Sequence, residues 1–282
     1  MEEDLNKQLI NACKDGCISS VLSLIDRGAD IHSRDSFTYT PLHYACINGH
    51  TDIALLLLDR GADIHSRHSN RGTPLHWACK NGHTDIALLL LDRGADIHSI
   101  GSDGCTPLHY ACMNGHTDIA LLLLDRGADI HCRSSYGSTP LHHACQYGHT
   151  DIALLLLDRG ADIHSRDDSH GWTPLHWACR QGHTDTALAL VRAGANTLAK
   201  NKFDKTPLDY ARSEELKAAL IREREKYLAW TRRKAFMMFL VGYRYIAMRH
   251  HQPQAAAAGQ DRREPLVDMV MRGVNMTIAS FL

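Results

Sequence analysis

The chain has 282 residues, which is enough for one or two domains with a substantial core. Its 31 lysines and arginines almost balance its 32 aspartates and glutamates, so its net charge does not attract DNA or RNA, and we expect no nucleic-acid partner. Its nine cysteines include no Cys-x-x-Cys pair and are too sparse for a disulfide-stapled secreted module.

The first residues, MEEDLNKQLINACKDG, are acidic and polar and contain no apolar signal-peptide stretch. We therefore expect a cytoplasmic protein with reduced thiols, and the nucleus is an alternative location. Residues 1–36 keep the register of the units that follow, but they lack the Thr-Pro-Leu-His motif of those units.

A 33-residue unit recurs along most of the chain. The seventeen residues from Gly49 to His65 recur unchanged three more times, each copy 33 residues after the last. One extra residue falls in the segment RDDSHGW before Thr173, so we expect that turn to be one residue longer than the others. Thr-Pro-Leu-His begins at Thr40, Thr73, Thr106, Thr139 and Thr173, and an altered copy, TPLD, begins at Thr206.

Each unit predicts a helix, a tight turn, a second helix and an extended loop. In the copy at Thr40, that threonine can cap the first helix, Pro41 suits its first position, and Gly49 suits a left-handed end. Thr51 is the predicted cap of the second helix, whose leucines, such as Leu122 in a later copy, we expect to be buried. Helices of about ten residues are marginal alone, so the pairs must stack into an all-α repeat solenoid.

The motifs TPLHxAC, GHTD and GAD at a period of 33 resemble the ankyrin repeat family, over roughly Leu5 to Leu220. The resemblance implies a stack of helix-turn-helix units with β-hairpin fingers and a concave face that binds partner proteins. It divides the chain into an N-terminal capping repeat at 1–36, repeats at 37–69, 70–102, 103–135, 136–169 and 170–202, and a C-terminal capping half-repeat at 203–222.

The repeat pattern ends before the C-terminal segment. We expect a basic amphipathic helix, long or kinked, at 223–251, a linker at 252–264 and a second amphipathic helix at 265–282. The most apolar stretch, 235–248, is too short for a bilayer and contains Arg244. Three roles stay open for this extension: closing the end of the solenoid, docking a second partner, or contacting an anionic membrane.

Histidines and cysteines recur in fixed registers, which argues against a metal site and a cofactor. Fifteen histidines fall in three registers, represented by His43, His50 and His65. Equivalent residues of stacked helices lie about 8–10 Å apart, whereas zinc needs its ligands at about 2.0–2.3 Å. The resemblance implies that the first two registers tie adjacent turns together, and it assigns no role to the third. We expect the cysteine register of Cys46 to be buried, and Cys105 to lie in an exposed turn as a candidate reactive thiol.

No catalytic constellation stands out in the sequence. It contains no glycine-rich phosphate loop, no GxSxG elbow and no HExxH motif. Its Asp and His residues repeat in every copy, whereas an active site needs one asymmetric arrangement. We therefore expect no enzyme activity and no catalytic residue.

Positions that differ between copies are the candidates for recognition. They lie in the turns before each TPLH motif and late in each first helix, two sets that the resemblance places on the concave face. Aromatic and arginine side chains supply most binding hot spots, and the mixed charge favours a specific protein epitope over a phosphate polymer. The candidates are Phe37, Tyr39, Arg71, Lys80, Asp103, Met113, Tyr136, Tyr147, Asp168, Trp172, Arg180 and Phe203.

The sequence thus predicts a monomeric, non-catalytic scaffold or adaptor that binds a partner protein on its concave face. One alternative is a substrate receptor of a ubiquitin ligase that recruits the machinery through its C-terminal helices. Another is a peripheral membrane adaptor that attaches through the basic helix.

Overall fold

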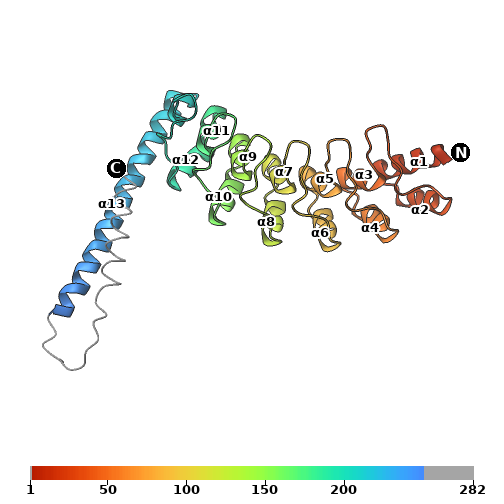
Figure 1. Cartoon of the computed structure of the whole chain (residues 1–282), viewed down its shortest axis with the longest axis horizontal. Helices are drawn as coiled ribbons and strands as arrows, with labels where there is room; N and C mark the ends of the chain where they lie inside the picture. The colour runs from red at the N-terminus through yellow and green to blue at the C-terminus, as the bar shows by residue number, and fades with distance from the viewer. Residues whose placement is uncertain (1, 251–282) are drawn as a thin grey trace, which may run out of the picture. The chain divides into compact units, whose positions relative to one another are not determined.

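The structure is a computed structural model that describes residues 2–250, with side chains described for residues 4–238. The chain forms two compact units, residues 1–221 and a second unit that starts at Arg222. In the first unit, helix pairs follow one another along the stack (Figure 1). The pairs are α1 (Glu2–Asp15) and α2 (Ile18–Asp26), α3 (Pro41–Asn48) and α4 (Thr51–Asp59), α5 (Pro74–Asn81) and α6 (Thr84–Asp92), α7 (Pro107–Asn114) and α8 (Thr117–Asp125), α9 (Pro140–Tyr147) and α10 (Thr150–Asp158), and α11 (Pro174–Gln181) and α12 (Thr184–Arg192).

The start and end of the first helix in each pair follow the prediction. Thr40 is the extended N-cap of α3, and its Oγ1 accepts a hydrogen bond from the His43 amide at 3.4 Å. The Nδ1 atom of His43 accepts in return from the Thr40 amide at 3.2 Å, which completes a capping box. Pro41 takes the first helical position and Gly49 ends the helix with φ 80°, a left-handed conformation that favours glycine.

The predicted cap of the second helix is wrong. Helix α4 begins at Thr51 itself, and its N-cap is His50, which makes no side-chain capping bond. The helical hydrogen bonds of α4 start one residue earlier than a Thr51 cap would require. The His50 carbonyl already accepts from the Ala54 amide at 2.9 Å. Asp52 lies in the first turn, where its charge favours the positive end of the helix.

The core runs between the inner helices, α1 to α11 with odd numbers, and the outer helices with even numbers. Leu42, Ala45 and Cys46 of α3 and Ile53 and Leu57 of α4 are almost fully buried, and the same positions are buried in the pairs from α5 to α12. The expectation for Leu122 needs correction, because this side chain is only half-buried. Its neighbour Leu123 is 0% exposed and fills the core position instead. A step of about 100° per residue turns only one of two consecutive leucines fully inward.

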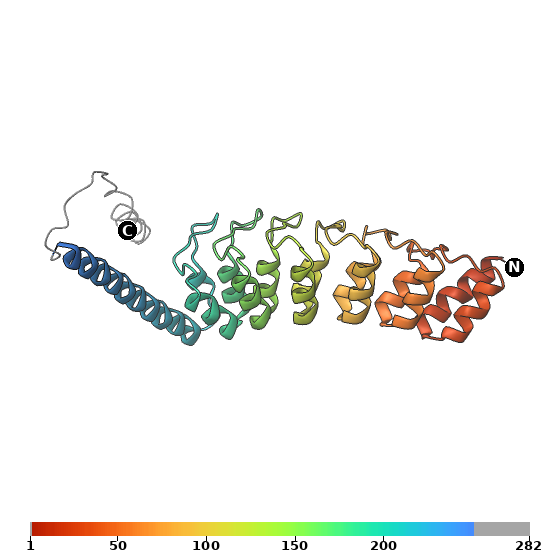
Figure 2. The ribbon, with the colours of Figure 1, turned by 90° about the horizontal axis from the view of Figure 1, so that it is seen from below.

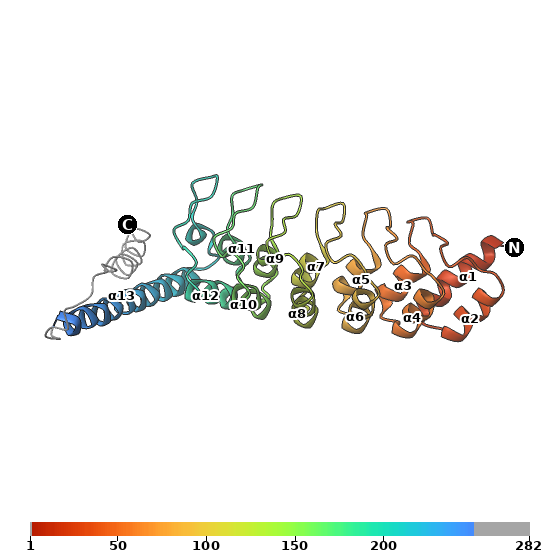
Figure 3. The same ribbon diagram turned by 60° about the horizontal axis from the view of Figure 1, so that its bottom comes forward.

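Fingers connect each pair to the next and project from one side of the stack (Figure 3). No residue within 2–250 is assigned to a β-strand, so the predicted β-hairpin fingers are hairpin-like loops. The first finger closes through a hydrogen bond from the Asp35 amide to the Tyr39 carbonyl at 3.1 Å. The finger before Thr173 closes between Asp167 and Trp172 at 2.9 Å and is one residue longer, as predicted.

Beyond the sixth pair, a 3₁₀ turn (Pro207–Tyr210) leads to α13 (Glu214–His250). The first turns of α13 close the core of the first unit, since Leu216 and Leu220 are buried there. The helix continues without a break into the second unit (Figure 2). None of the described helices combines the length and apolarity that a membrane-crossing segment needs. The predicted linker at 252–264 and the helix at 265–282 lie outside the described residues.

Candidate functional site

The fingers and the inner helices together form one face of the first unit, which we call the concave face. Neighbouring inner helices contact each other more extensively than neighbouring outer helices do, so the stack is tighter on the inner side. The repeated residues of this face are engaged in contacts between copies. The variable residues occupy the finger tips and the ends of the inner helices.

Histidines of the TPLH register hold each repeat to the next finger. His142 accepts from the Thr139 amide through Nδ1 at 3.1 Å, and its Nε2 lies 3.0 Å from the carbonyl oxygen of Trp172. Burial lowers the pKa of this imidazole from 6.5 to about 4. The equivalent contacts join His43 to Gly72, His76 to Cys105, His109 to Ser138 and His176 to Lys205.

Histidines of the Gly-His register point in the opposite direction along the stack. The Nε2 atom of His83 lies 3.0 Å from the Ile47 carbonyl oxygen of the preceding inner helix, and His149 contacts the Met113 carbonyl in the same way. The resemblance correctly implied that both registers tie adjacent turns. Rings of the third register, such as His65, are exposed, and here the backbone amide donates to Asp63 at 2.9 Å.

The finger tips are joined by a second set of contacts, which the sequence did not reveal. One backbone amide in each tip after the first donates to a carbonyl of the preceding tip, and these bonds form a continuous row along the concave face. These backbone hydrogen bonds cannot be predicted from the residue pattern, because they do not depend on the side chains. The donor and acceptor pairs are Ser69 and Phe37, Ser102 and Asn70, Ser135 and Asp103, Asp168 and Tyr136, and Lys202 and His170.

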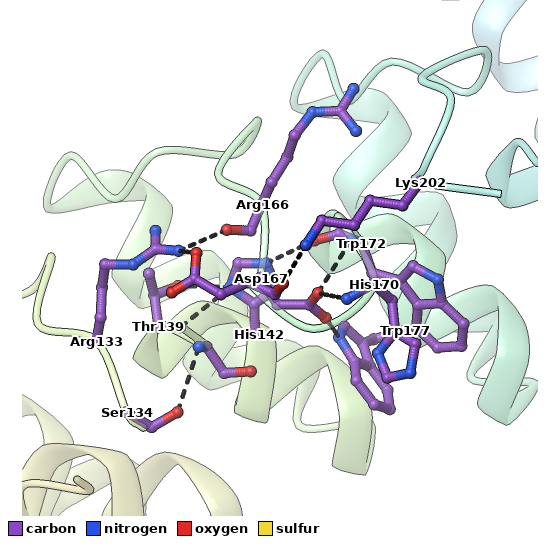
Figure 4. A network of polar contacts seen from close by, with 12 residues as sticks. Arg133, Ser134, Thr139, His142, Arg166, Asp167, His170, Trp172, Trp177 and Lys202 are labelled. Carbon is purple, nitrogen blue, oxygen red and sulfur yellow. Dashed lines mark hydrogen bonds and ion pairs between the residues drawn. The ribbon is translucent and has the colours of Figure 1, made fainter. Parts of the chain in front are cut away.

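The fifth finger contains the densest polar network (Figure 4). The carboxylate of Asp167 accepts from the His170 amide at 2.8 Å and from the Trp177 indole at 3.0 Å. Arg133 forms an ion pair with Asp168 at 2.7 Å and donates to a carbonyl of the same finger. The network fixes the shape of the finger before any partner arrives.

Four of the predicted aromatic candidates are exposed. Phe37 is 66% exposed and Tyr136 is 67% exposed, and both lie at the third position before a threonine cap. Phe203 occupies the same position in the last finger, and Tyr147 lies at the end of α9. These side chains offer apolar area without contributing to the core.

Trp172 does not belong with the exposed candidates. Only 2% of this residue is exposed, so the expectation that its ring meets a partner is wrong. The ring packs edge-on against Trp177, with centroids 4.7 Å apart, and against Tyr210 at 4.9 Å. It lies directly before Thr173, a position where the backbone is held inward by His142.

Cys105 occupies the same position before Thr106, and the same correction applies. The residue is 3% exposed, not in an exposed turn, and burial raises the pKa of its thiol. The register of Cys46 is buried as expected, and burial raises the pKa of that thiol as well. Neither thiol is available as a thiolate nucleophile.

The remaining candidates differ in their exposure and in their contacts within the protein. Tyr39 is half-buried and stacks on His68 with centroids 4.5 Å apart, and Met113 is half-buried at the end of α7. Arg71 is exposed at a finger tip with φ 62°. Asp103 and Asp168 are engaged by Tyr110 and Arg133, respectively, while Lys80 and Arg180 rest on aromatic rings.

Sequence reasoning missed Lys14, whose ammonium lies 4.2 Å from the centre of the Tyr44 ring. The signal was present, because Lys14 follows Cys13 as Lys80 follows Cys79. Across residues 2–250, no group of three or more histidine, cysteine or acidic side chains is arranged to hold a metal ion. The face provides hydrogen-bonding, ionic and apolar contacts, which suit binding.

Comparisons with known proteins agree with this architecture. The family model for ankyrin repeats in three copies matches residues 9–101 and 97–167, and the model for a single ankyrin repeat matches residues 170–202. The crystal structure of the human ASB11 ankyrin repeat domain is similar, with 30% sequence identity and a TM-score of 0.70. That match covers 76% of this chain and 96% of the other. The search of curated proteins found no match. The family models account for more than half of the sequence, and the chain therefore belongs to the ankyrin repeat family, whose repeats form protein-interaction domains.

Proposed function

We propose that this chain is a non-catalytic scaffold or adaptor that binds a partner protein on its concave face. The observation that carries the proposal is that repeated residues stabilise the stack, whereas variable residues are exposed on the concave face. The histidines of the TPLH and Gly-His registers, the core leucines and the cysteines of the Cys46 register are buried or bonded to neighbouring copies. Exposed aromatic side chains lie at positions that vary. The proposed binding residues are Phe37, Tyr39, Arg71, Lys80, Asp103, Met113, Tyr136, Tyr147, Asp168, Arg180 and Phe203.

The physical mechanism is complementarity to a surface that is already ordered. Backbone bonds between finger tips and the polar network around Asp167 hold the fingers in place. Less conformational entropy is therefore lost on binding than with free loops. Large aromatic side chains then provide contact area with few rotatable bonds.

Proximity labelling with the intact chain tests this proposal. A variant with Phe37→Ser, Tyr136→Ser and Phe203→Ser removes the aromatic tips, while Ile18→Ser with Leu198→Ser removes exposed apolar side chains elsewhere. We expect a set of labelled proteins that the tip variant loses and the control variant keeps. Identical labelling by all three chains would contradict binding through the tips.

The two alternative functions depend on the C-terminal extension. A ligase-recruiting role needs the C-terminal helices, of which the one expected at 265–282 lies outside the described residues. A membrane role needs the basic cluster Arg232, Arg233 and Lys234, which is exposed on α13. Vesicle flotation of the intact chain, compared with a variant in which these three residues become glutamate, separates the membrane role from the one proposed here.

A further inference from the structure

The carboxylates of the concave face are satisfied by contacts within the protein. Asp35 accepts from the amides of Phe37 and Tyr39, each at 2.9 Å, and from the Tyr44 hydroxyl. Asp103 is held in the same way, by the Cys105 amide and the Tyr110 hydroxyl. Asp167 accepts from the His170 and Trp172 amides and from the Trp177 indole.

Asp168, which stands beside these groups, is also neutralised. Its carboxylate pairs with Arg133 at 2.7 Å, and its backbone carbonyl accepts from the Lys202 ammonium. The acidic residues that made the face look mixed in charge therefore shape the fingers. Their charges are compensated by neighbouring dipoles and cations before a partner approaches.

Three cations of the same face have a different environment. The ammonium groups of Lys14 and Lys80 lie 4.2 Å and 4.7 Å from the ring centres of Tyr44 and Trp77. The guanidinium carbon of Arg180 lies 4.7 Å from the ring centre of Trp172. Within the described part of the chain, none of the three forms an ion pair with a carboxylate.

The three cations share one register and form a row. Each follows the buried cysteine of an inner helix, in α1, α5 and α11. Steps of two and three repeats, at about 8–10 Å per stacked helix, place them roughly 16–20 Å and 24–30 Å apart. An extended chain advances about 3.3 Å per residue, so these gaps correspond to about five to six and about seven to nine residues.

We propose that the concave face binds an acidic, extended segment of the partner protein, with carboxylates at these two separations opposite Lys14, Lys80 and Arg180. This inference rests on the proposed function and specifies the chemistry of its partner. The aromatic rings hold each cation near its bound position, which reduces the ordering cost of a new ion pair. Tyr136 and Tyr147 are exposed on the same face for apolar contacts between the carboxylates.

A protein segment fits this row better than a nucleic acid does. Nucleic-acid backbones carry a charge at every nucleotide and are gripped by a dense array of lysines and arginines. Between the three cations, the same register holds Ile47, Met113 and Gln146, which are uncharged. Widely spaced cations with uncharged residues between them match a chain that carries occasional carboxylates.

The test is a peptide-display selection with the intact chain and random 18-residue peptides. We expect selected peptides to share aspartate or glutamate at the two predicted separations. One selected peptide is then synthesised with a fluorescent label, and its dissociation constant is measured by anisotropy. Lys14→Glu, Lys80→Glu and Arg180→Glu should each weaken binding by about tenfold or more, because reversal turns attraction into repulsion.

Arg27→Glu is the matched control, because it makes the same change of net charge at an exposed position that follows the outer helix α2. It should leave the dissociation constant unchanged. A peptide with lysine in place of one carboxylate should in turn bind the Lys80→Glu variant better than it binds the wild type.

The other outcomes separate this inference from the proposed function. Peptides that lack acidic residues, tolerate all three reversals and are lost on Tyr136→Ser would overturn the acidic segment and leave the concave face as the binding site. Peptides that bind regardless of changes at the tips and at the cation row would overturn both. Equal displacement by a single-stranded oligonucleotide would show that the row selects polyanions and not a protein segment.

Discussion

The Nε2 atom of His142 lies 3.0 Å from the carbonyl oxygen of Trp172, although the two residues are 30 positions apart in the chain. Because Nδ1 of the same ring accepts from the Thr139 amide, the imidazole is neutral and carries its proton on Nε2. One ring thus caps its own helix and holds the finger of the next repeat. A second proton would occupy the acceptor nitrogen and remove the capping contact.

This arrangement predicts that stability falls in mildly acidic solution. Burial lowers the pKa of the imidazoles at His43, His76, His109 and His142 from 6.5 to about 4. Below pH 6.5 the unfolded chain binds more protons than the folded chain. The contribution of these imidazoles to the free energy of unfolding is therefore fully present above pH 6.5 and is lost as the pH falls towards 4. Each site contributes at most about 1.4 kcal/mol per pH unit. Urea unfolding between pH 7.5 and 4.5 measures this slope.

Two variants attribute the slope to the buried rings. His142→Gln removes one buried titrating group and should make the dependence on pH shallower. His65→Gln removes an exposed imidazole of the third register and should keep the wild-type slope. Equal slopes for both variants would contradict the assignment.

Replacing Trp172 by alanine should destabilise the stack. The side chain is 2% exposed and packs between Trp177 and Tyr210, so its removal should cost about 3–5 kcal/mol. Arg180→Ala removes only the exposed cation above the ring and should change the free energy of unfolding by less than about 1 kcal/mol. Guanidinium titrations monitored by circular dichroism compare the two, and equal losses would argue against the burial of Trp172.

Neighbouring leucines of α8 offer a second matched pair. Leu123→Ala empties a fully buried position and should cost about 2–5 kcal/mol. Leu122→Ala shortens a half-buried side chain and should cost clearly less. The outer-helix sequence is identical in four copies, so Leu90→Ala and Leu89→Ala should repeat the same order in thermal melts. A reversed order in either copy would contradict the orientation of the outer helices.

The repeat architecture could be predicted because its signals are local and periodic. Thr40, Pro41 and Gly49 each favour one backbone conformation, and the 33-residue period brings the same residues into contact in every copy. Thr51 was misplaced because residue type alone did not distinguish a cap from a first helical residue. Here the geometry of the preceding turn decided the outcome.

The site could be predicted only in part because exposure depends on which way a finger residue points. Phe37 and Tyr136 lie three positions before a threonine cap and are exposed. Trp172 and Cys105 lie directly before the cap, where their carbonyls contact the histidine of the preceding repeat, and both residues are buried. Residue type and spacing do not reveal this difference in orientation, which explains both errors.

The bonds between finger tips lead to the last prediction, which concerns Gly104. This residue has φ 74°, and a Cβ atom there would lie 2.5 Å from the backbone nitrogen of Ser135, whose amide donates to Asp103. Gly104→Ala should therefore break the link between the third and fourth tips. Gly127→Ala is the control, because its φ is 87° and no atom lies within 4 Å of the added Cβ. Both variants share the cost of a left-handed alanine, about 1 kcal/mol, so their difference reports the clash alone. Hydrogen exchange should accelerate at the Ser135 amide only in Gly104→Ala. Equal exchange in both variants would mean that contacts within each finger, and not bonds between neighbouring tips, fix the tips. The position of Tyr136 would then depend on the fourth finger alone.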